Sequence, residues 1–239
     1  MSEPKYNLSN AKFGGGFAEG TQIGGTLNDY STNDITDENR ESSDNTADVK
    51  TILVLAANPK TTSRLRLDEE VREIDAGLQR ARKREAFNLQ FDLQVRWAVR
   101  VRDVSQALLD FNPQIVHFSG HGGGDDGLAL EDETGMQYVS TAALAELFEL
   151  FSQNQKNPIE CVILNACYSE VQATAISQYI PYVIGMNKAI GDKAAIEFAV
   201  GFYSAASAGE SIDFAYKLGC NSIAMAGIPE NLTPVLKVK

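Results

Sequence analysis

Apolar runs of strand length alternate with segments of helical periodicity from residue 51 onward. Residues 52–57 form a continuous apolar run, which is typical of a strand buried on both faces of a parallel sheet. From Leu67 to about residue 86, apolar residues recur at helical spacing. This alternation predicts an α/β fold with a mostly parallel central sheet and helices on both faces. The same patterns predict further strands at 88–99, 115–118, 161–164 and 182–186, a hairpin of 128–130 with 137–139, and helices at 103–110, 141–151, 169–179, 192–206 and 211–218.

The chain has a different composition before residue 51. Six glycines lie between Gly14 and Gly25, and a polar, acidic stretch follows them. Residues 1–49 carry nine acidic and three basic side chains, more than half of the net charge of −11. Such a segment buries too little apolar surface to offset the entropy of ordering the chain. We therefore predict a glycine-rich segment at 1–30, a flexible acidic linker at 31–50 and a folded domain at 51–239.

The overall composition excludes several classes of protein. A net charge of −11 argues against a general nucleic-acid binder, which needs a basic face to meet phosphates. No stretch approaches 18 apolar residues and the first residues begin no secretory signal, so we expect a cytoplasmic protein without a membrane span. Three cysteines without a CxxC pair provide neither a disulfide framework nor a zinc site, and we expect no metal and no cofactor.

Two predicted strands end in residues that can carry chemistry. The strand at 115–118 continues into a glycine-rich loop that contains His121, and the strand at 161–164 is followed closely by Cys167. The carboxyl ends of parallel strands form the usual site of an α/β sheet. A helix that begins just after Cys167 favours its thiolate, and a histidine on a neighbouring strand end can take its proton. That pair predicts attack of a thiolate on a carbonyl group, whereas His117, within its strand, is expected to be a core residue.

Other motifs fit these loops less well. The glycine loop lacks the Gly-Lys-Ser/Thr ending of a phosphate-binding loop, and no GxGxxG sequence opens a helix. Residues 121–124, His-Gly-Gly-Gly, match the oxyanion loop of some lipases and esterases, but the GxSxG elbow of that fold is missing. A thiol esterase therefore stays an alternative to a peptidase. A second alternative is a catalytically silent scaffold that recruits partners.

The two loops together resemble the signature strands of the caspase-like cysteine peptidases. The segment 119–122, Ser-Gly-His-Gly, precedes the segment 164–167, Leu-Asn-Ala-Cys, and Cys167 lies 46 positions after His121. The resemblance is to the CHAT branch of that superfamily, and it implies a three-layer caspase-like sandwich that cleaves protein or peptide substrates. It also implies that His121 is the general base, that Cys167 is the nucleophile and that the N–H groups of Gly122 and Cys167 form the oxyanion hole.

The same resemblance points to residues that contact the substrate. It places Asn165, Arg66 and Asp192 around the pocket for the substrate side chain, without naming the preferred residue. Arg66 has the alternative of pairing with Glu70, four residues along its own helix. Some relatives need calcium, and the acidic clusters at 125–126 and 131–133 leave that open.

The glycine-rich start resembles bacterial amyloid signalling motifs and the core of the RHIM motif. Phe13, Phe17, Ile23 and Leu27 are spaced so that they can form a dry seam between stacked copies. A disordered tail is the alternative. The resemblance implies self-assembly or binding of an upstream receptor through residues 11–30, and so an effector of bacterial defence or regulated cell death.

Overall fold

The computed structural model describes residues 48–82, 89–133, 135–153 and 157–239. The predicted segment 1–30 and most of the predicted linker 31–50 lie outside the described residues. The described residues form nine strands: β1 (Asp48–Ala56), β2 (Leu89–Trp97), β3 (Ile115–Ser119), β4 (His121–Gly122), β5 (Leu128–Asp132), β6 (Gly135–Val139), β7 (Cys161–Asn165), β8 (Tyr182–Met186) and β9 (Pro234–Val238).

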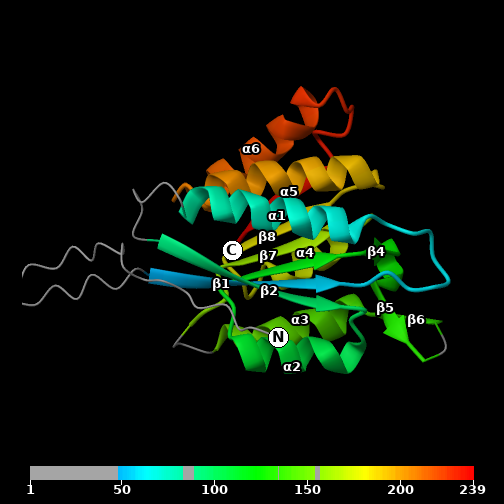
Figure 1. Ribbon diagram of the computed structural model, residues 1–239. Helices are drawn as coiled ribbons and strands as arrows, with labels where there is room; N and C mark the ends of the chain where they lie inside the picture. The colour runs from blue at the N-terminus through cyan, green and yellow to red at the C-terminus, as the bar shows by residue number, and fades with distance from the viewer. Residues whose placement is uncertain (1–47, 83–88, 134, 154–156) are drawn as a thin grey trace, which may run out of the picture. The chain divides into compact units, whose positions relative to one another are not determined.

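Six of these strands form the central sheet in the order β2-β1-β3-β7-β8-β9. All neighbouring pairs run parallel except β8 and β9, which pair antiparallel. Strands β4, β5 and β6 form a separate antiparallel sheet at the carboxyl end of the parallel strands, as Figure 1 shows. Residues in β3 and β7 are buried throughout, as expected for central strands that are covered on both faces.

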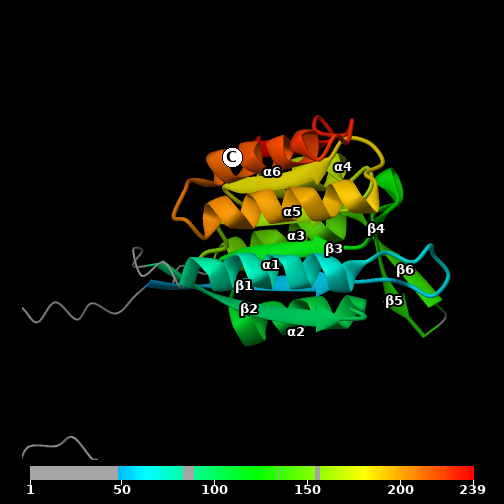
Figure 2. The same cartoon turned by 45° about the horizontal axis from the view of Figure 1, so that its top comes forward.

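Helices cover both faces of the central sheet. Those described are α1 (Leu67–Arg82), α2 (Val101–Phe111), α3 (Thr141–Ser152), α4 (Glu170–Ile176), α5 (Asp192–Ala206) and α6 (Ile212–Met225). Figure 2 shows α5 lying between α1 and α6 on one face, and Figure 1 shows α2 and α3 on the other face. The apolar side chains of α1, α5 and α6 pack in one core cluster with Ile52 and Ile163, and those of α2, α3 and α4 pack in a second with Leu53 and Val162.

The predicted α/β class, with its three layers and mostly parallel sheet, is confirmed by this arrangement. The predicted strands and helices are all present, with ends shifted by a few residues in most cases and with α6 ending seven residues later than expected. Ser140 caps α3 by accepting a hydrogen bond from the Ala143 N–H at 3.3 Å. Strand β9 was not predicted, because it begins with Pro234 and is only partly buried at the sheet edge, so it lacks the continuous apolar run of a central strand.

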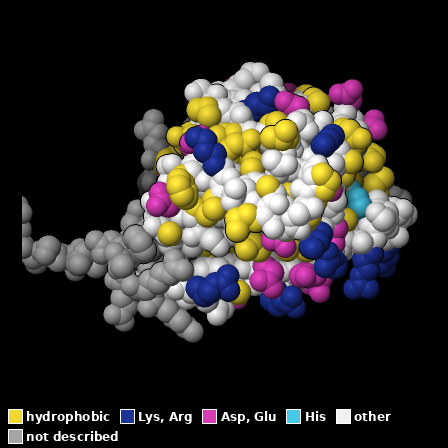
Figure 3. Space-filling model, turned by 90° about the horizontal axis from the view of Figure 1, so that it is seen from above, with side chains coloured by type: hydrophobic (Ala, Val, Ile, Leu, Met, Phe, Trp, Pro, Cys, Tyr) yellow, Lys and Arg dark blue, Asp and Glu magenta, His cyan; other side chains and the backbone are white. Residues whose placement is uncertain are grey.

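The outer surface of the helical layer with α1, α5 and α6 has a mixed character. Figure 3 shows hydrophobic patches on this side between scattered basic and acidic side chains. Within the described part of the chain, no helix combines the length and the apolar character that are needed to cross a membrane.

Candidate active site

The two predicted catalytic loops leave adjacent strands at the same level. Ala56 in β1 pairs with Ser119 in β3, and Ser119 pairs with Asn165 in β7, so these residues form one row across the sheet. His121 and Cys167 each lie two residues beyond this row, just after the ends of the neighbouring parallel strands β3 and β7. Both line a small cavity of about 30 Å³. The structure therefore brings together the two residues that the sequence predicts as base and nucleophile.

The glycine that follows His121 lies directly against the backbone of Cys167. A Cβ atom at Gly122 would lie 2.2 Å from the carbonyl oxygen of Cys167, so no larger residue fits without moving one of the loops. Tyr168, next to the cysteine, has a φ of 55°, in the left-handed region that bulky residues rarely adopt. The approach of the two loops thus depends on a glycine on one side and a strained turn on the other.

The ring of His121 has a defined tautomer. Its Nε2 atom lies 2.8 Å from the carbonyl oxygen of Ser63, in the loop between β1 and α1. A carbonyl oxygen can only accept, so Nε2 carries the proton and donates it. In the neutral ring Nδ1 then has a free lone pair and can accept a proton.

The three cysteines differ in their surroundings. Cys167 is partly exposed, and its Sγ atom lies 3.7 Å from the carbonyl oxygen of Ile190. Cys161 is fully buried in β7 and Cys220 is partly buried in α6. Burial raises the pKa of both of these thiols, which keeps them protonated at neutral pH. Cys161 belongs to the hydrophobic core, and Cys220 packs against it from α6.

A buried polar cluster lies beneath the cavity, and its centre is Glu70 of α1. The carboxylate of Glu70 accepts hydrogen bonds from the Ser119 hydroxyl and from Asn165 Nδ2, the latter at 2.6 Å. Its Oε1 atom lies 3.0 Å from His117 Nε2, an ion-pair distance without hydrogen-bond alignment. On the other side of the ring, His117 Nδ1 lies 3.0 Å from the Tyr203 hydroxyl. All five side chains are almost fully buried, so His117 is a core residue as predicted.

The family of the chain follows from comparison with known proteins. The model of the CHAT domain family matches residues 25–217, more than three quarters of the sequence. The chain belongs to the CHAT family. Among its relatives, a protein named "Probable protease" from Gillisia limnaea is 28% identical over 185 residues, which are 77% of this chain and 31% of that protein. A protein named "Roc-COR-CHAT protease" from an unknown prokaryotic organism is 24% identical over 202 residues, 83% of this chain and 19% of that protein.

The chain thus spans less than a third of the length of these two relatives. Among solved structures, the separase–securin complex of Saccharomyces cerevisiae has a TM-score of 0.46 at 16% identity, over 81% of this chain and 12% of the separase chain. The secreted C11 cysteine protease iotapain of Bacteroides thetaiotaomicron has a TM-score of 0.45 at 10% identity, over 73% of this chain and 61% of that protease. Both TM-scores lie below 0.5, so these two structures support no further conclusion.

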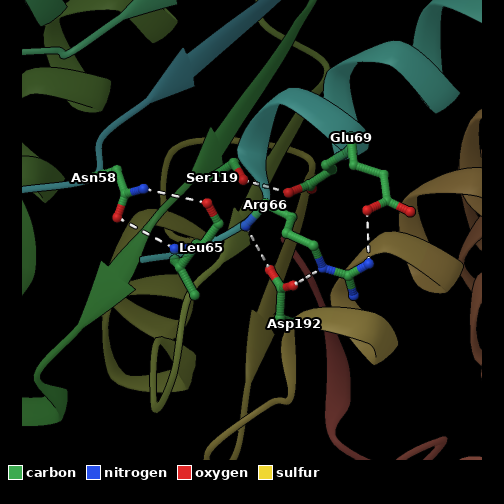
Figure 4. Close-up of polar contacts among 7 residues, drawn as sticks. Asn58, Leu65, Arg66, Glu69, Ser119 and Asp192 are labelled. Carbon is green, nitrogen blue, oxygen red and sulfur yellow. Dashed lines mark hydrogen bonds and ion pairs between the residues drawn. The ribbon is translucent and has the colours of Figure 1, made fainter. Parts of the chain in front are cut away.

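Two predicted substrate-binding residues of this CHAT domain are paired with each other. Asp192 accepts hydrogen bonds from the backbone N–H of Arg66 at 3.0 Å and from its Nε atom at 2.6 Å, as Figure 4 shows. The bond to Asp192 raises the pKa of the Arg66 side chain. Arg66 also contacts Glu69 at 2.6 Å, and the alternative of a pair with Glu70 is not found: Glu70 is buried against the sheet and Glu69 is partly exposed.

The third predicted substrate-binding residue, Asn165, lies at the bottom of the cavity. Only 3% of its surface is exposed, and its Nδ2 atom donates to Glu70 and to the Ala195 carbonyl oxygen. Its Oδ1 atom is buried and has no hydrogen-bond partner among the described residues. Asn165 and Asp192 both line the cavity with the two catalytic candidates. Arg66 does not line it and is connected to it by its bond to Asp192.

Sequence analysis did not identify Glu70 as part of the site. Glu70 stands with Asp68 and Glu69 in the acidic first turn of α1, where carboxylates suit the helix dipole and carry no catalytic signal. The signal that would have found it is its spacing, since Glu70 lies three residues after Leu67 and four before Ile74, on the apolar stripe of the helix.

The acidic clusters that left calcium binding open are not arranged as a metal site. Asp125 and Asp126 are exposed, as expected for solvated loop charges. Within the described ranges, no group of three or more His, Cys, Asp or Glu side chains could hold a metal ion.

Proposed function

We propose that this CHAT domain is a cysteine endopeptidase that uses His121 and Cys167 as a catalytic dyad. The observation that carries the proposal is that both side chains line one cavity, with the free Nδ1 lone pair of the histidine available to a thiol. The protease names of two relatives add support. No third acid is needed, because the Ser63 carbonyl oxygen already orients the ring.

The proposed reaction has two stages. His121 Nδ1 takes the proton of Cys167, and the thiolate attacks the carbonyl carbon of the scissile peptide bond. The N–H groups of Gly122 and Cys167 stabilise the oxyanion that forms on the carbonyl oxygen. When this intermediate collapses, the C–N bond breaks and His121 protonates the leaving amine. Water then attacks the thioester, again with His121 as the base, and releases the acid and the Cys167 thiol.

The lining of the cavity favours a basic side chain in the substrate. The carboxyl groups among its lining side chains are those of Glu70 and Asp192, and no lysine or arginine of the described residues lines it. Asn165 Oδ1 adds a buried acceptor without a partner in the described part of the chain. A buried acceptor gains most from a donor on the ligand, and lysine or arginine supplies both the donor and the compensating charge. We therefore infer that the peptidase cleaves after a basic residue and that Asn165 binds it, with Asp192 and Arg66 at the rim.

Covalent labelling tests the assignment of the nucleophile. With iodoacetamide at pH 7.5, we expect Cys167 to react at least about tenfold faster than Cys161 or Cys220, because the raised pKa of both other thiols leaves little thiolate. The reaction of Cys220 should increase as the pH rises towards its raised pKa. Peptide mapping by mass spectrometry measures all three sites in one sample.

The variant His121→Ala is the control for this experiment. It should slow the labelling of Cys167 and leave that of Cys220 unchanged, because only Cys167 has this histidine beside it in the cavity. Equal rates at Cys167 and Cys220, together with no effect of His121→Ala, would contradict the dyad and favour a catalytically silent scaffold.

We further propose that the domain acts as an effector of defence or cell death and is recruited through residues 11–30. The support is the order of segments in the sequence, in which an amyloid-like motif and a linker precede the peptidase domain. The chain should form fibres that bind thioflavin T, whereas deletion of residues 1–30 should abolish them. A chain with residues 11–30 scrambled controls for length and composition. Fibres of equal amount from the scrambled chain would rule out this motif.

A further inference from the structure

The side chain of Asn58 closes the loop that joins β1 to α1. Asn58 Nδ2 donates a hydrogen bond to the carbonyl oxygen of Leu65 at 3.2 Å, and the Leu65 N–H donates to Asn58 Oδ1 at 3.4 Å. One amide side chain therefore pairs with both backbone groups of a residue seven positions away, as Figure 4 shows. The effect is to fold residues 58–65 into a closed ring.

This ring contains the carbonyl group that holds His121. Ser63 lies inside it and accepts the hydrogen bond from His121 Nε2 at 2.8 Å. A turn inside the ring adds rigidity, since both the N–H and the hydroxyl of Thr62 donate to the Pro59 carbonyl oxygen, at 2.9 and 2.7 Å. Just outside it, Asp192 holds the N–H of Arg66. The Ser63 carbonyl is thus fixed from both ends of its loop.

The loop has little packing of its own to keep this shape. Ser63 is exposed, as are its neighbours Arg64 and Arg66, and Leu65 is only partly buried. Pro59 at the start of the loop is buried, but Ser63 and its neighbours are not, so the position of the Ser63 carbonyl depends mainly on hydrogen bonds. Asn58 is partly buried, and its backbone N–H donates to Glu131 Oε1 at 3.2 Å. The backbone that carries the closing side chain is therefore bonded to β5.

We propose that Asn58 is a positioning residue for His121. By closing the loop it keeps the Ser63 carbonyl on Nε2, which holds the ring in the tautomer whose Nδ1 can accept the proton of Cys167. This inference rests on the proposed role of His121. A displacement of a catalytic group by about 1 Å can cost about 100-fold in rate.

The test uses the variant Asn58→Ala in the full chain and reads the tautomer directly. The sequence has two histidines, so the ring nitrogens of His117 and His121 can be resolved by nitrogen NMR of the 15N-labelled protein. We expect His121 to be a single Nε2–H tautomer in the wild type and a mixture in Asn58→Ala, while buried His117 stays unchanged. For peptide cleavage, kcat should fall by up to about 100-fold with little change in KM.

A matched control lies at the opposite edge of the sheet. Gln114 also joins two backbone groups through its side-chain amide, accepting from the Thr51 N–H at 2.7 Å and donating to the Asn112 carbonyl oxygen at 3.1 Å. Gln114→Ala should leave the His121 tautomer and kcat unchanged. If the alanine variant of Asn58 fails to fold, Asn58→Asp gives the same reading, because it keeps the size but loses the donor to Leu65.

An unchanged His121 tautomer in the Asn58 variant would overturn the proposal. This result is distinct from failure of the peptidase assignment, since the NMR measurement needs no turnover. A wild-type chain that cleaves no peptide but shows the tautomer shift on Asn58→Ala would support the positioning role and contradict the peptidase alone.

Discussion

Replacing Cys167 with alanine is expected to abolish peptide cleavage, with kcat/KM falling by about 10,000-fold or more. The reason is that the proposed reaction runs through a bond to Sγ, and the described residues around the cavity offer no other thiol in its place. The measurement is cleavage of a peptide library by purified wild type beside Cys167→Ala. The same library identifies the residue before the cleaved bond, which we expect to be lysine or arginine.

The matched control is Cys220→Ala, which removes another partly buried thiol, in α6. It should cleave the library at the wild-type rate and with the same preference. Cleavage that persists in Cys167→Ala would contradict the assignment of the nucleophile. If the wild type hydrolyses a small ester but cleaves no peptide of the library, the result would instead favour a thiol esterase that uses the same loops.

The proposed catalytic pair could be predicted because its signal is local. His121 and Cys167 each come just after a buried apolar run, and parallel strands place such residues at one edge of the sheet whatever the details of packing. Because Ser119 pairs with Asn165 across the two strands, His121 and Cys167 lie side by side two residues further on. This part of the site follows from strand order and from the residues directly beyond each strand.

The supporting contacts could not be predicted in the same way. The bond from His121 to Ser63 joins residues 58 positions apart, and it depends on the path of a loop whose shape is set by one asparagine. The pair of Arg66 and Asp192 spans 126 positions and joins the starts of two helices. Glu69 and Glu70 lie three and four residues after Arg66, so helical spacing brings both within its reach. Only the packing of α1 on the sheet decides which of the two carboxylates faces inward.

The buried carboxylate of Glu70 connects the stability of the domain to the geometry of its site. It joins α1 to Ser119 and His117 on β3 and to Asn165 on β7, the two strands that lead into the proposed catalytic loops. These polar groups are almost completely shielded from water. Without the carboxylate they would keep the cost of burial and lose the partner that compensates for it.

We therefore expect Glu70→Ala to lower the free energy of unfolding by about 1–3 kcal/mol for each buried donor that loses this acceptor, the Ser119 hydroxyl and Asn165 Nδ2. Urea unfolding followed by circular dichroism measures the change. Glu69→Ala is the matched control, since its neighbouring carboxylate makes a surface pair with Arg66. Such pairs contribute at most about 1 kcal/mol.

Glu70→Gln separates the charge from the shape of this side chain. The amide keeps one acceptor for Ser119 or Asn165 but turns its other end into a donor, which meets donors on the neighbouring side chains. Its stability should lie between those of wild type and Glu70→Ala, and the peptidase activity of the folded protein should fall with it as β3 and β7 shift. If Glu70→Ala unfolds at the same urea concentration as Glu69→Ala, the cluster does not support the site.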